Sequence, residues 1–212
     1  DQTGEVLCVL ASAYGDMGRF SLCGNDFSKA GPWYRKALAL LQDTDCVGQV
    51  CLLVLYGRTV FAVDDHPRAK SLFQEAYALA EKTGEHPGRT AAGAYCAYFA
   101  MADGDEETAA RLLREAMEEE QVLHSPMEGA ILNFISMKIR RRLDLDQQDS
   151  GLTVLLPDRA DDYARRGVRL GNSIPDVFEV QILTKELRDG ISSQLRYRSW
   201  ELYSKNKRFM SE

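Results

Sequence analysis

The sequence predicts an all-α fold in which antiparallel helical hairpins stack on one another. Three segments carry the same series of a small, a large and a small residue, at offsets of four and seven positions. They are Ala30, Tyr34 and Ala37; Ala69, Phe73 and Ala76; and Ala109, Leu113 and Ala116. The first members of the series stand at positions 30, 69 and 109. A period of about 40 residues is typical of an α-solenoid, and the chain has room for about five hairpins.

The two offsets have a physical reason. On a helix with about 3.6 residues per turn, positions i, i+4 and i+7 share one face. Alanine at the first and third positions lets a neighbouring helix approach closely, and the larger side chain between them fills the space. We therefore expect each series to face another helix, because one hairpin cannot bury its own apolar stripe. The alternative is three ordinary amphipathic helices whose alanines coincide.

The three segments resemble the second helix of the tetratricopeptide (TPR) motif. The matching stretches are GNDFSKAGPWYRKAL (24–38), RAKSLFQEAYAL (68–79) and GDEETAARLLREAM (104–117). The resemblance covers residues 5–126 and implies a right-handed superhelix with a concave binding face. The sequence departs from the family in three ways. The family period is shorter, at about 34 residues. The closing prolines Pro87 and Pro126 come late, and the tryptophan–leucine–glycine signature of the first helix is absent. A relative with a longer period, of the kind found in subunits of large assemblies, stays open.

The 212 residues are expected to form one domain. The best repeats occupy 5–126, an irregular repeat with an inserted loop occupies 127–171, and capping helices occupy 174–209. The first helix is expected over 5–17, ended by Gly18.

The second helix is expected over 26–42. Pro32 argues against one continuous helix over 19–42, unless it falls in the first turn, where its missing N–H costs nothing. In the turn Asp64–Pro67, we expect the aspartates to cap the next helix and Pro67 to take its first position. The segments Gly84–Gly88 and Asp103–Asp105 are expected to be turns. The expected later helices span 46–63, 67–82, 89–102, 106–122, 127–142, 158–170 and 175–188.

The segment 143–157 interrupts the repeat. The next small-residue series, Ala160, Ala164 and Gly167, begins later than the period requires, so about a dozen residues are inserted after the series of Ala109. The stretch LDLDQQD lacks the mid-loop glycine and the closing glutamate of a calcium loop, so we expect no metal there. We expect a surface loop that returns through LTVLL to cover an apolar edge.

A candidate binding surface follows from aligning the hairpins. The residues expected on the inward side of the first helices are Arg58, Phe61, Tyr98, Met101, Asn133, Met137 and Arg140. A cationic cluster of Lys138, Arg140, Arg141 and Arg142 ends the helix expected over 127–142. These cations either complement the helix dipole or bind an acidic or phosphorylated peptide.

The stretch 190–209 offers an alternative interface, in which basic and aromatic residues alternate. Its candidate residues are Arg196, Tyr197, Arg198, Trp200 and Tyr203. Three interpretations stay open: a terminal capping helix with a polar outer face, a protein interface rich in tryptophan, tyrosine and arginine, and RNA binding. RNA is the least favoured of the three at the overall charge of the chain.

Composition and motifs exclude several classes of function. A net charge of −6 and a pI near 5.2 argue against a general nucleic-acid binder, and the longest apolar run, residues 50–56, is too short to span a bilayer. No catalytic motif is present. His66, His86 and His124 fall in expected loops without metal-ligand spacing. We therefore predict no catalytic residue, no metal and no cofactor. The acidic run Glu118–Glu120 is interpreted as a solvated helix face.

The five cysteines include no CxxC pair, which favours an intracellular, reducing compartment. The cytoplasm is preferred, and an organelle stays open because a leader could have been removed before Asp1.

The predicted function is a non-catalytic scaffold or adaptor that binds a protein, or an acidic or amphipathic peptide, on its concave face. The alternative is a structural subunit built permanently into a large complex.

Overall fold

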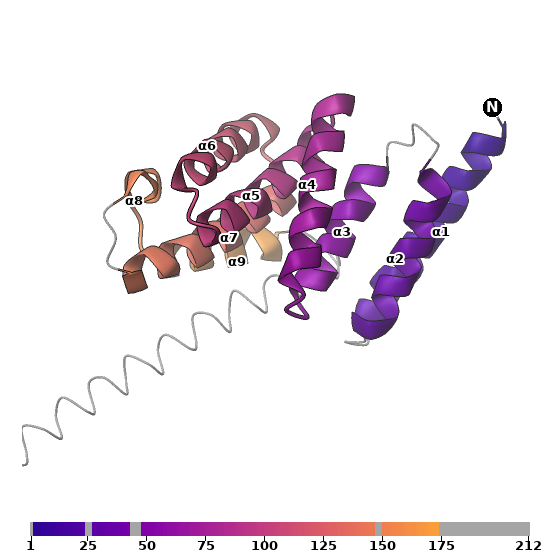
Figure 1. Cartoon of the computed structure of the whole chain (residues 1–212), viewed down its shortest axis with the longest axis horizontal. Helices are drawn as coiled ribbons and strands as arrows, with labels where there is room; N and C mark the ends of the chain where they lie inside the picture. Colours follow the sequence, from indigo (N-terminus) through magenta and orange to yellow (C-terminus); the bar gives the residue numbers. More distant parts are fainter. Residues whose placement is uncertain (1, 24–26, 43–47, 147–149, 174–212) are drawn as a thin grey trace, which may run out of the picture.

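The structure is a computed structural model that describes residues 2–23, 27–42, 48–146 and 150–173. In these residues it contains nine helices and no strand (Figure 1). The helices are α1 (Gln2–Cys23), α2 (Phe27–Leu41), α3 (Gln49–Phe61), α4 (His66–Thr83), α5 (His86–Ala102), α6 (Glu106–Leu123), α7 (Pro126–Asp146), α8 (Gly151–Leu155) and α9 (Ala160–Asn172). The expected helices over 175–188 and 190–209 lie outside the described residues.

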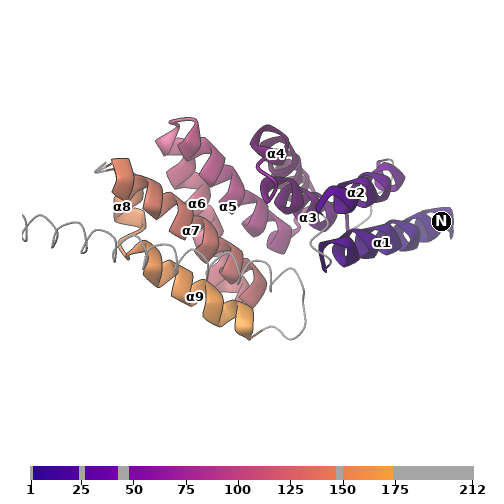
Figure 2. The same cartoon turned by 90° about the horizontal axis from the view of Figure 1, so that it is seen from below.

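The helices form a row of hairpins in two layers (Figures 1 and 2). The pairs α1/α2, α3/α4, α5/α6 and α7/α9 pack together, and α3, α5 and α7 also pack directly on one another. The predicted all-α solenoid is therefore confirmed, with four hairpins in the described part of the chain.

The small–large–small series make the contacts between these helices. All nine residues of the three series are buried, with at most 3% of their surface exposed. The series Ala160, Ala164 and Gly167 is buried in α9 in the same way, so the repeat resumes after the insertion. The interpretation as three unrelated amphipathic helices is wrong, because each stripe occupies the same place in its hairpin.

Each large residue of the series stands 16 positions after a small residue in the other helix of its hairpin, and in the first two hairpins the two residues face each other. A Cβ atom added at Gly57 would lie 2.9 Å from the ring of Phe73, and one added at Gly18 would lie 2.8 Å from the ring of Tyr34. In these two hairpins, an aromatic ring of the second helix thus fits because the facing position of the first helix is a glycine. In the third hairpin the equivalent pair is Ala97 and the smaller Leu113.

This packing corrects the expected end of the first helix. Gly18 does not stop α1, which continues to Cys23. Gly18 is buried inside the helix because it makes room for a ring of the paired helix.

The turns repeat with the same period as the helices. Asp64 and Gly104 are one period apart, and both have left-handed backbones, with φ of 61° and 85°. In each case the next residue caps the following helix, since Asp65 accepts from Arg68 N–H and Asp105 from Thr108 N–H. Gly84 and His124, which are also one period apart, end α4 and α6 with φ of 71° and 49°. The repeat therefore includes the backbone of its turns.

Two expected proline positions need correction. Pro87 does not lie in a loop: α5 begins at His86, because Glu85 accepts from Gly88 N–H at 2.9 Å and Pro87 occupies the first turn. Pro32 lies inside α2 and not in its first turn. It therefore removes one backbone hydrogen bond from α2.

The segment expected to be a loop over 143–157 is partly helical. The helix α7 continues to Asp146, beyond the predicted end at 142, and α8 follows. Leu152 and Leu156 are fully buried, and α8 packs on α6. This agrees with the prediction that the LTVLL stretch covers an apolar edge.

Among the cysteines whose side chains the structure describes, Cys8, Cys51 and Cys96 form no disulfide bond. Cys96 is buried, and burial raises its pKa to about 12, whereas Cys51 is exposed and Cys8 is half-buried. Cys96 thus packs as a small apolar residue.

Exchanging Ala76 for a charged residue tests the buried stripe. Ala76 is fully buried and Glu75 is exposed. Ala76→Glu places an unpaired charge in the core and is expected to lower the free energy of unfolding by about 3 kcal/mol or more. Glu75→Ala is expected to change it by less than about 0.5 kcal/mol. Thermal and urea unfolding followed by circular dichroism measures both, and equal stabilities would show that the register is wrong.

A second set of variants tests the fit between Gly57 and the ring of Phe73. Gly57→Ala is expected to cost about 1–3 kcal/mol, because the new methyl group overlaps the ring of Phe73. The same substitution in a Phe73→Leu background should cost much less, since Ala97 already faces Leu113. Gly4→Ala is the control: it lies in α1 with nothing near its Cβ position, and it should stabilise by about 0.5–1 kcal/mol. Additive effects of Gly57→Ala and Phe73→Leu in urea unfolding would contradict this interpretation.

Candidate binding surface

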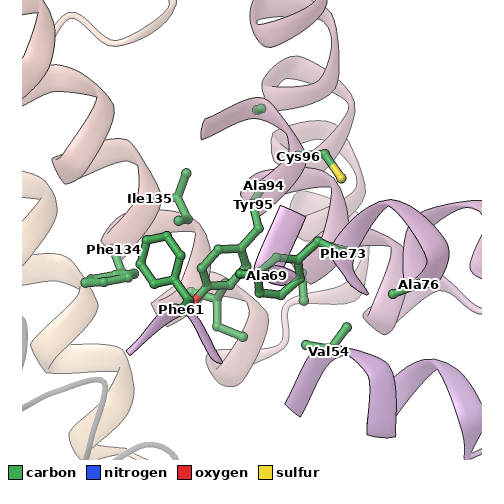
Figure 3. Close-up of a cluster of buried hydrophobic side chains, with 14 of the residues drawn as sticks. Val54, Phe61, Ala69, Phe73, Ala76, Ala94, Tyr95, Cys96, Phe134 and Ile135 are labelled. Carbon is green, nitrogen blue, oxygen red and sulfur yellow. The ribbon is translucent and has the colours of Figure 1, made fainter. Parts of the chain in front are cut away.

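A row of aromatic rings connects three helices beneath the candidate surface (Figure 3). The rings of Phe73 in α4 and Tyr95 in α5 stack with centroids 4.0 Å apart and planes 3° apart. Phe61, at the end of α3, meets the ring of Tyr95 edge-on at 5.4 Å. Edge-to-face and stacked rings of this kind fix the orientation of their neighbours. The end of α3 is thereby held against α5.

Above this row lies an aromatic–cation cluster, which comprises Phe61, Tyr98, Phe134 and Lys138. The ring of Tyr98 meets Phe61 edge-on at 5.5 Å. The Nζ atom of Lys138 lies over the rings of Phe61 and Phe134, at 5.4 Å and 4.9 Å from their centroids. Phe61 and Phe134 are buried, whereas Tyr98 and Lys138 are half-buried. Buried rings thus hold an ammonium group at the surface by cation–π attraction.

Two neighbouring charges act in opposite directions on the pKa of Tyr98. Burial raises the pKa of Tyr98, the positive charge of Arg142 lowers it, and the negative charge of Asp64 raises it. The hydroxyl group is therefore protonated at neutral pH, and it can donate a hydrogen bond to an acceptor. Arg142 is exposed, so this side of α7 carries a second cation near the cluster.

The cluster belongs to a longer series along the first helices, which we call the ladder: Arg19, Arg58, Tyr98 and Lys138. These four residues are 39, 40 and 40 positions apart. Arg58 is half-buried, like Tyr98 and Lys138, and the side chain of Arg19 is 44% exposed and pairs with Asp16 at 3.3 Å. The candidate residues predicted from the sequence omitted Arg19. The signal was present, because Arg19 and Arg58 each follow a glycine that faces a ring.

The ladder lies on the layer made by the first helices of the hairpins, which we call the inner layer. The first helices α3, α5 and α7 pack directly on one another. The second helices are separated by grooves. Tyr56 and Thr59 of α3 form the floor of the groove between α2 and α4, and Cys96 and Phe99 of α5 form the floor of the groove between α4 and α6. One further groove, between α1 and α3, runs beside Arg19 and is lined by Ser12, Asp16, Cys51 and Leu55.

Three of the predicted inward residues make contacts within the fold. Asn133 donates to the carbonyl of Gly129 in its own helix at 2.8 Å and lines a groove on the other layer with Tyr163 and Arg166. Met137 is buried with 2% exposure, and Met101 is packed against the core. Among the predicted residues, the structure brings together Phe61, Tyr98 and Lys138, with Arg142 beside them and Arg58 on the same layer.

Two members of the predicted cationic cluster interact within the fold. Arg140 donates to the carbonyl of Leu156 at 3.3 Å and pairs with Asp144 at 2.9 Å. Burial lowers the pKa of Arg141, and the negative charge of Asp161 opposes this effect. The dipole interpretation of the cluster is wrong, because α7 continues to Asp146 and its last turn contains no basic residue.

The alternative interface lies outside the described residues. Nothing is therefore added to the prediction for Arg196, Tyr197, Arg198, Trp200 and Tyr203.

In the described ranges, no three histidine, cysteine or acidic side chains come close enough to hold a metal ion. His86 Nδ1 lies 2.6 Å from a carboxylate oxygen of Glu119, and His66 packs edge-on against Phe61 at 5.1 Å. Of the helices that the structure describes, none combines the length and the apolar character that a membrane span requires.

Comparison with known proteins supports the fold. No protein-family model matches the chain, and no curated protein matches it. Among solved structures, it is similar to the nearly identical TPR-like repeats of a protein from Podosopora anserina described as a putative kinesin light chain. The TM-score is 0.50 at 15% sequence identity, over 92% of this chain and 99% of that chain. The chain therefore has a TPR-like helical-repeat fold, as the sequence resemblance predicted.

Two substitutions of opposite sign test the surroundings of Tyr98. Arg142→Gln removes a positive charge and is expected to raise the pKa of Tyr98, whereas Asp64→Asn is expected to lower it. Arg165→Gln, an exposed change on α9, should leave the pKa unchanged. A pH titration followed by the ring-carbon NMR signal of labelled tyrosine measures all three.

The same pKa has a consequence for stability. Because the folded pKa of Tyr98 lies above its ordinary value of 10, its stabilising contribution is complete below pH 10 and is lost as the pH rises through the folded pKa.

The two substitutions at Arg142 and Asp64 have a contradicting outcome. If Arg142→Gln and Asp64→Asn shifted the pKa of Tyr98 in the same direction, the proposed geometry would be wrong.

Proposed function

We propose that this chain is a non-catalytic protein-interaction scaffold, and that its ladder binds an acidic segment of a protein partner. The observation that carries the proposal is the ladder itself, in which three cations and a tyrosine recur at one register of the first helices. The chain has a net charge of −6. A row of cations on one layer of an acidic protein creates a local field that attracts negative charge.

The spacing of the ladder suits an extended peptide that crosses the first helices. Packed helices have axes about 8–10 Å apart, and an extended chain advances by about 3.3 Å per residue. A peptide lying across the layer would therefore meet one ladder residue about every third position. The expected partner segment carries Asp or Glu at that spacing. Tyr98 would donate a hydrogen bond to it, and the cations would form charge-assisted hydrogen bonds.

The fold supports this mode of binding. Stacked hairpins present a continuous surface made from equivalent positions of successive repeats. A linear ligand can then contact several repeats through similar chemistry. Arg140 and Arg141 are left out of the proposed site, because they contact α8 and the charge on α9.

A second candidate function, a subunit built permanently into a large complex, is favoured by one observation. The helix α1 carries large exposed apolar side chains, among them Val9 at 71% and Phe20 at 74% exposure. Exposed apolar patches mark protein interaction surfaces. This surface is separate from the ladder.

Charge reversal on the ladder tests the proposed function. The probe is a fluorescent peptide with glutamate at every third position. Lys138→Glu and Arg58→Glu should each weaken binding by about tenfold at low salt and reduce its salt dependence, because each replaces an attractive charge by a repulsive one. The matched control is Arg114→Glu, the same charge change at an exposed position on α6.

Fluorescence polarisation at several salt concentrations measures the affinities, and circular dichroism checks that each variant keeps its helices. An equal loss of affinity in Arg114→Glu would mean that only the net charge matters. Unchanged binding in the two ladder variants would refute the ladder as the site.

A further inference from the structure

The helix α1 has two apolar faces, and only one of them packs against α2. The packed face contains Ala11, Gly15 and Gly18, which are buried. Gly18 faces the ring of Tyr34 in α2, whereas Gly15 lies close to Leu52 in α3. The other face, which we call the outer stripe, consists of exposed apolar residues. They are Val6 (65% exposed), Val9 (71%), Leu10 (41%), Ala13, Met17 (44%) and Phe20 (74%).

The outer stripe has the dimensions of a helix-packing surface. At about 100° per residue its six members fall within about 100° around the helix, which is the width of a stripe that faces a core. From Val6 to Phe20 it extends over about 21 Å, at about 1.5 Å per residue.

The register of the repeat shows what such a surface packs against. With Gly18 aligned to Gly57 and Ala97, Met17 corresponds to Tyr56 and Cys96, and Phe20 corresponds to Thr59 and Phe99. All four of these equivalents are buried, with at most 9% exposure. They lie on the faces of α3 and α5 that meet the second helix of the preceding hairpin.

The contacts on α3 and α5 define the chemistry of the covering helix. On α3, Tyr56 meets the ring of Tyr34 in α2 at 6.0 Å and accepts a hydrogen bond from Arg35 at 3.0 Å. On α5, Phe99 meets the ring of Phe73 in α4 at 6.4 Å. Both covering helices therefore supply an aromatic ring, and α2 also supplies a basic residue at its edge.

We propose that the outer stripe of α1 is a docking surface for an amphipathic helix of a partner protein. That helix takes the place that α2 holds on α3 and α4 holds on α5, with small and aromatic residues on its apolar face. Glu5 and Asp16 are exposed along one edge of the stripe, so a basic flank on the partner helix completes the match. Two copies of α1 packed antiparallel would instead bring their two acidic edges together, which is unfavourable.

A helix from the protein itself is the appropriate probe. A stapled peptide with the sequence of residues 65–84 carries the apolar face of α4, including Phe73, and the basic residues Arg68 and Lys70. Fluorescence polarisation with the full chain should show saturable binding. Phe20→Glu and Met17→Glu should each weaken it by about tenfold or more, because they bury an unpaired charge under the peptide. The same peptide with Phe73→Ser should bind weakly to the unchanged protein.

Two control variants separate this surface from the others. Ser12→Glu adds the same charge at an exposed position of α1 outside the stripe, and it should leave binding of the peptide unchanged. Lys138→Glu, which tests the ladder, should also leave it unchanged.

Three outcomes would overturn the proposal. The first is the absence of saturable binding to the unchanged protein. The second is equal binding by Phe20→Glu and Ser12→Glu. The third is a dimer in sedimentation that Phe20→Glu dissociates, because a second copy would then cover the stripe.

Discussion

The first two hairpins depend on the fit of one aromatic ring into a gap left where the facing helix has a glycine. Phe73 lies against Gly57 within its own hairpin and stacks on Tyr95 of the next hairpin. One ring therefore joins two helices of one repeat to the first helix of the following repeat. The offset of 16 positions between the small and the large member sets how the two helices of each hairpin face each other. Neither residue can change size without a change in the other, since protein interiors are closely packed.

Polar contacts connect the outer layer, where the second helices stand apart. Tyr77 of α4 donates to Glu115 of α6 at 2.8 Å, and Lys70 of α4 pairs with Asp103 after α5. Although burial raises the pKa of Glu115, the hydrogen bonds from Tyr77 and Arg111 outweigh it, so the pKa lies below its ordinary value. The inner layer is thus joined by apolar packing and the outer layer by hydrogen bonds that bridge its grooves.

Residues at regular spacing allowed most of the architecture to be predicted from the sequence. The series built on Ala69 and Phe73 predicted the hairpins and their period, because burial of a stripe depends only on local spacing. The same reasoning failed at Gly18, because a glycine that ends a helix and a glycine that accommodates a ring look alike until the paired residue is known. It failed at Pro87, where the capping carboxylate of Glu85 decides that the helix begins early.

The surface was harder to predict than the fold, because helix ends determine which cations are available. The predicted end of α7 at residue 142 placed Arg140 and Arg141 at a terminus. The continuation of α7 to Asp146 and the return of α8 bring Arg140 to the Leu156 carbonyl and Arg141 near the charge of Asp161. Lys138 and Tyr98 were both predicted as candidate binding residues, but the 40-residue spacing that places them at the same register of successive first helices was not used to pair them.

The neighbour-to-neighbour packing of the hairpins has a consequence for local opening. A helix in the middle of the row, such as α5, is held by its own hairpin partner and by helices on both sides, whereas α1 is held chiefly by α2. Protection of backbone amides against exchange with deuterated solvent then follows position along the row and not burial alone. Among the described helices, we therefore expect stronger protection in α5, which packs on four other helices, than in α1.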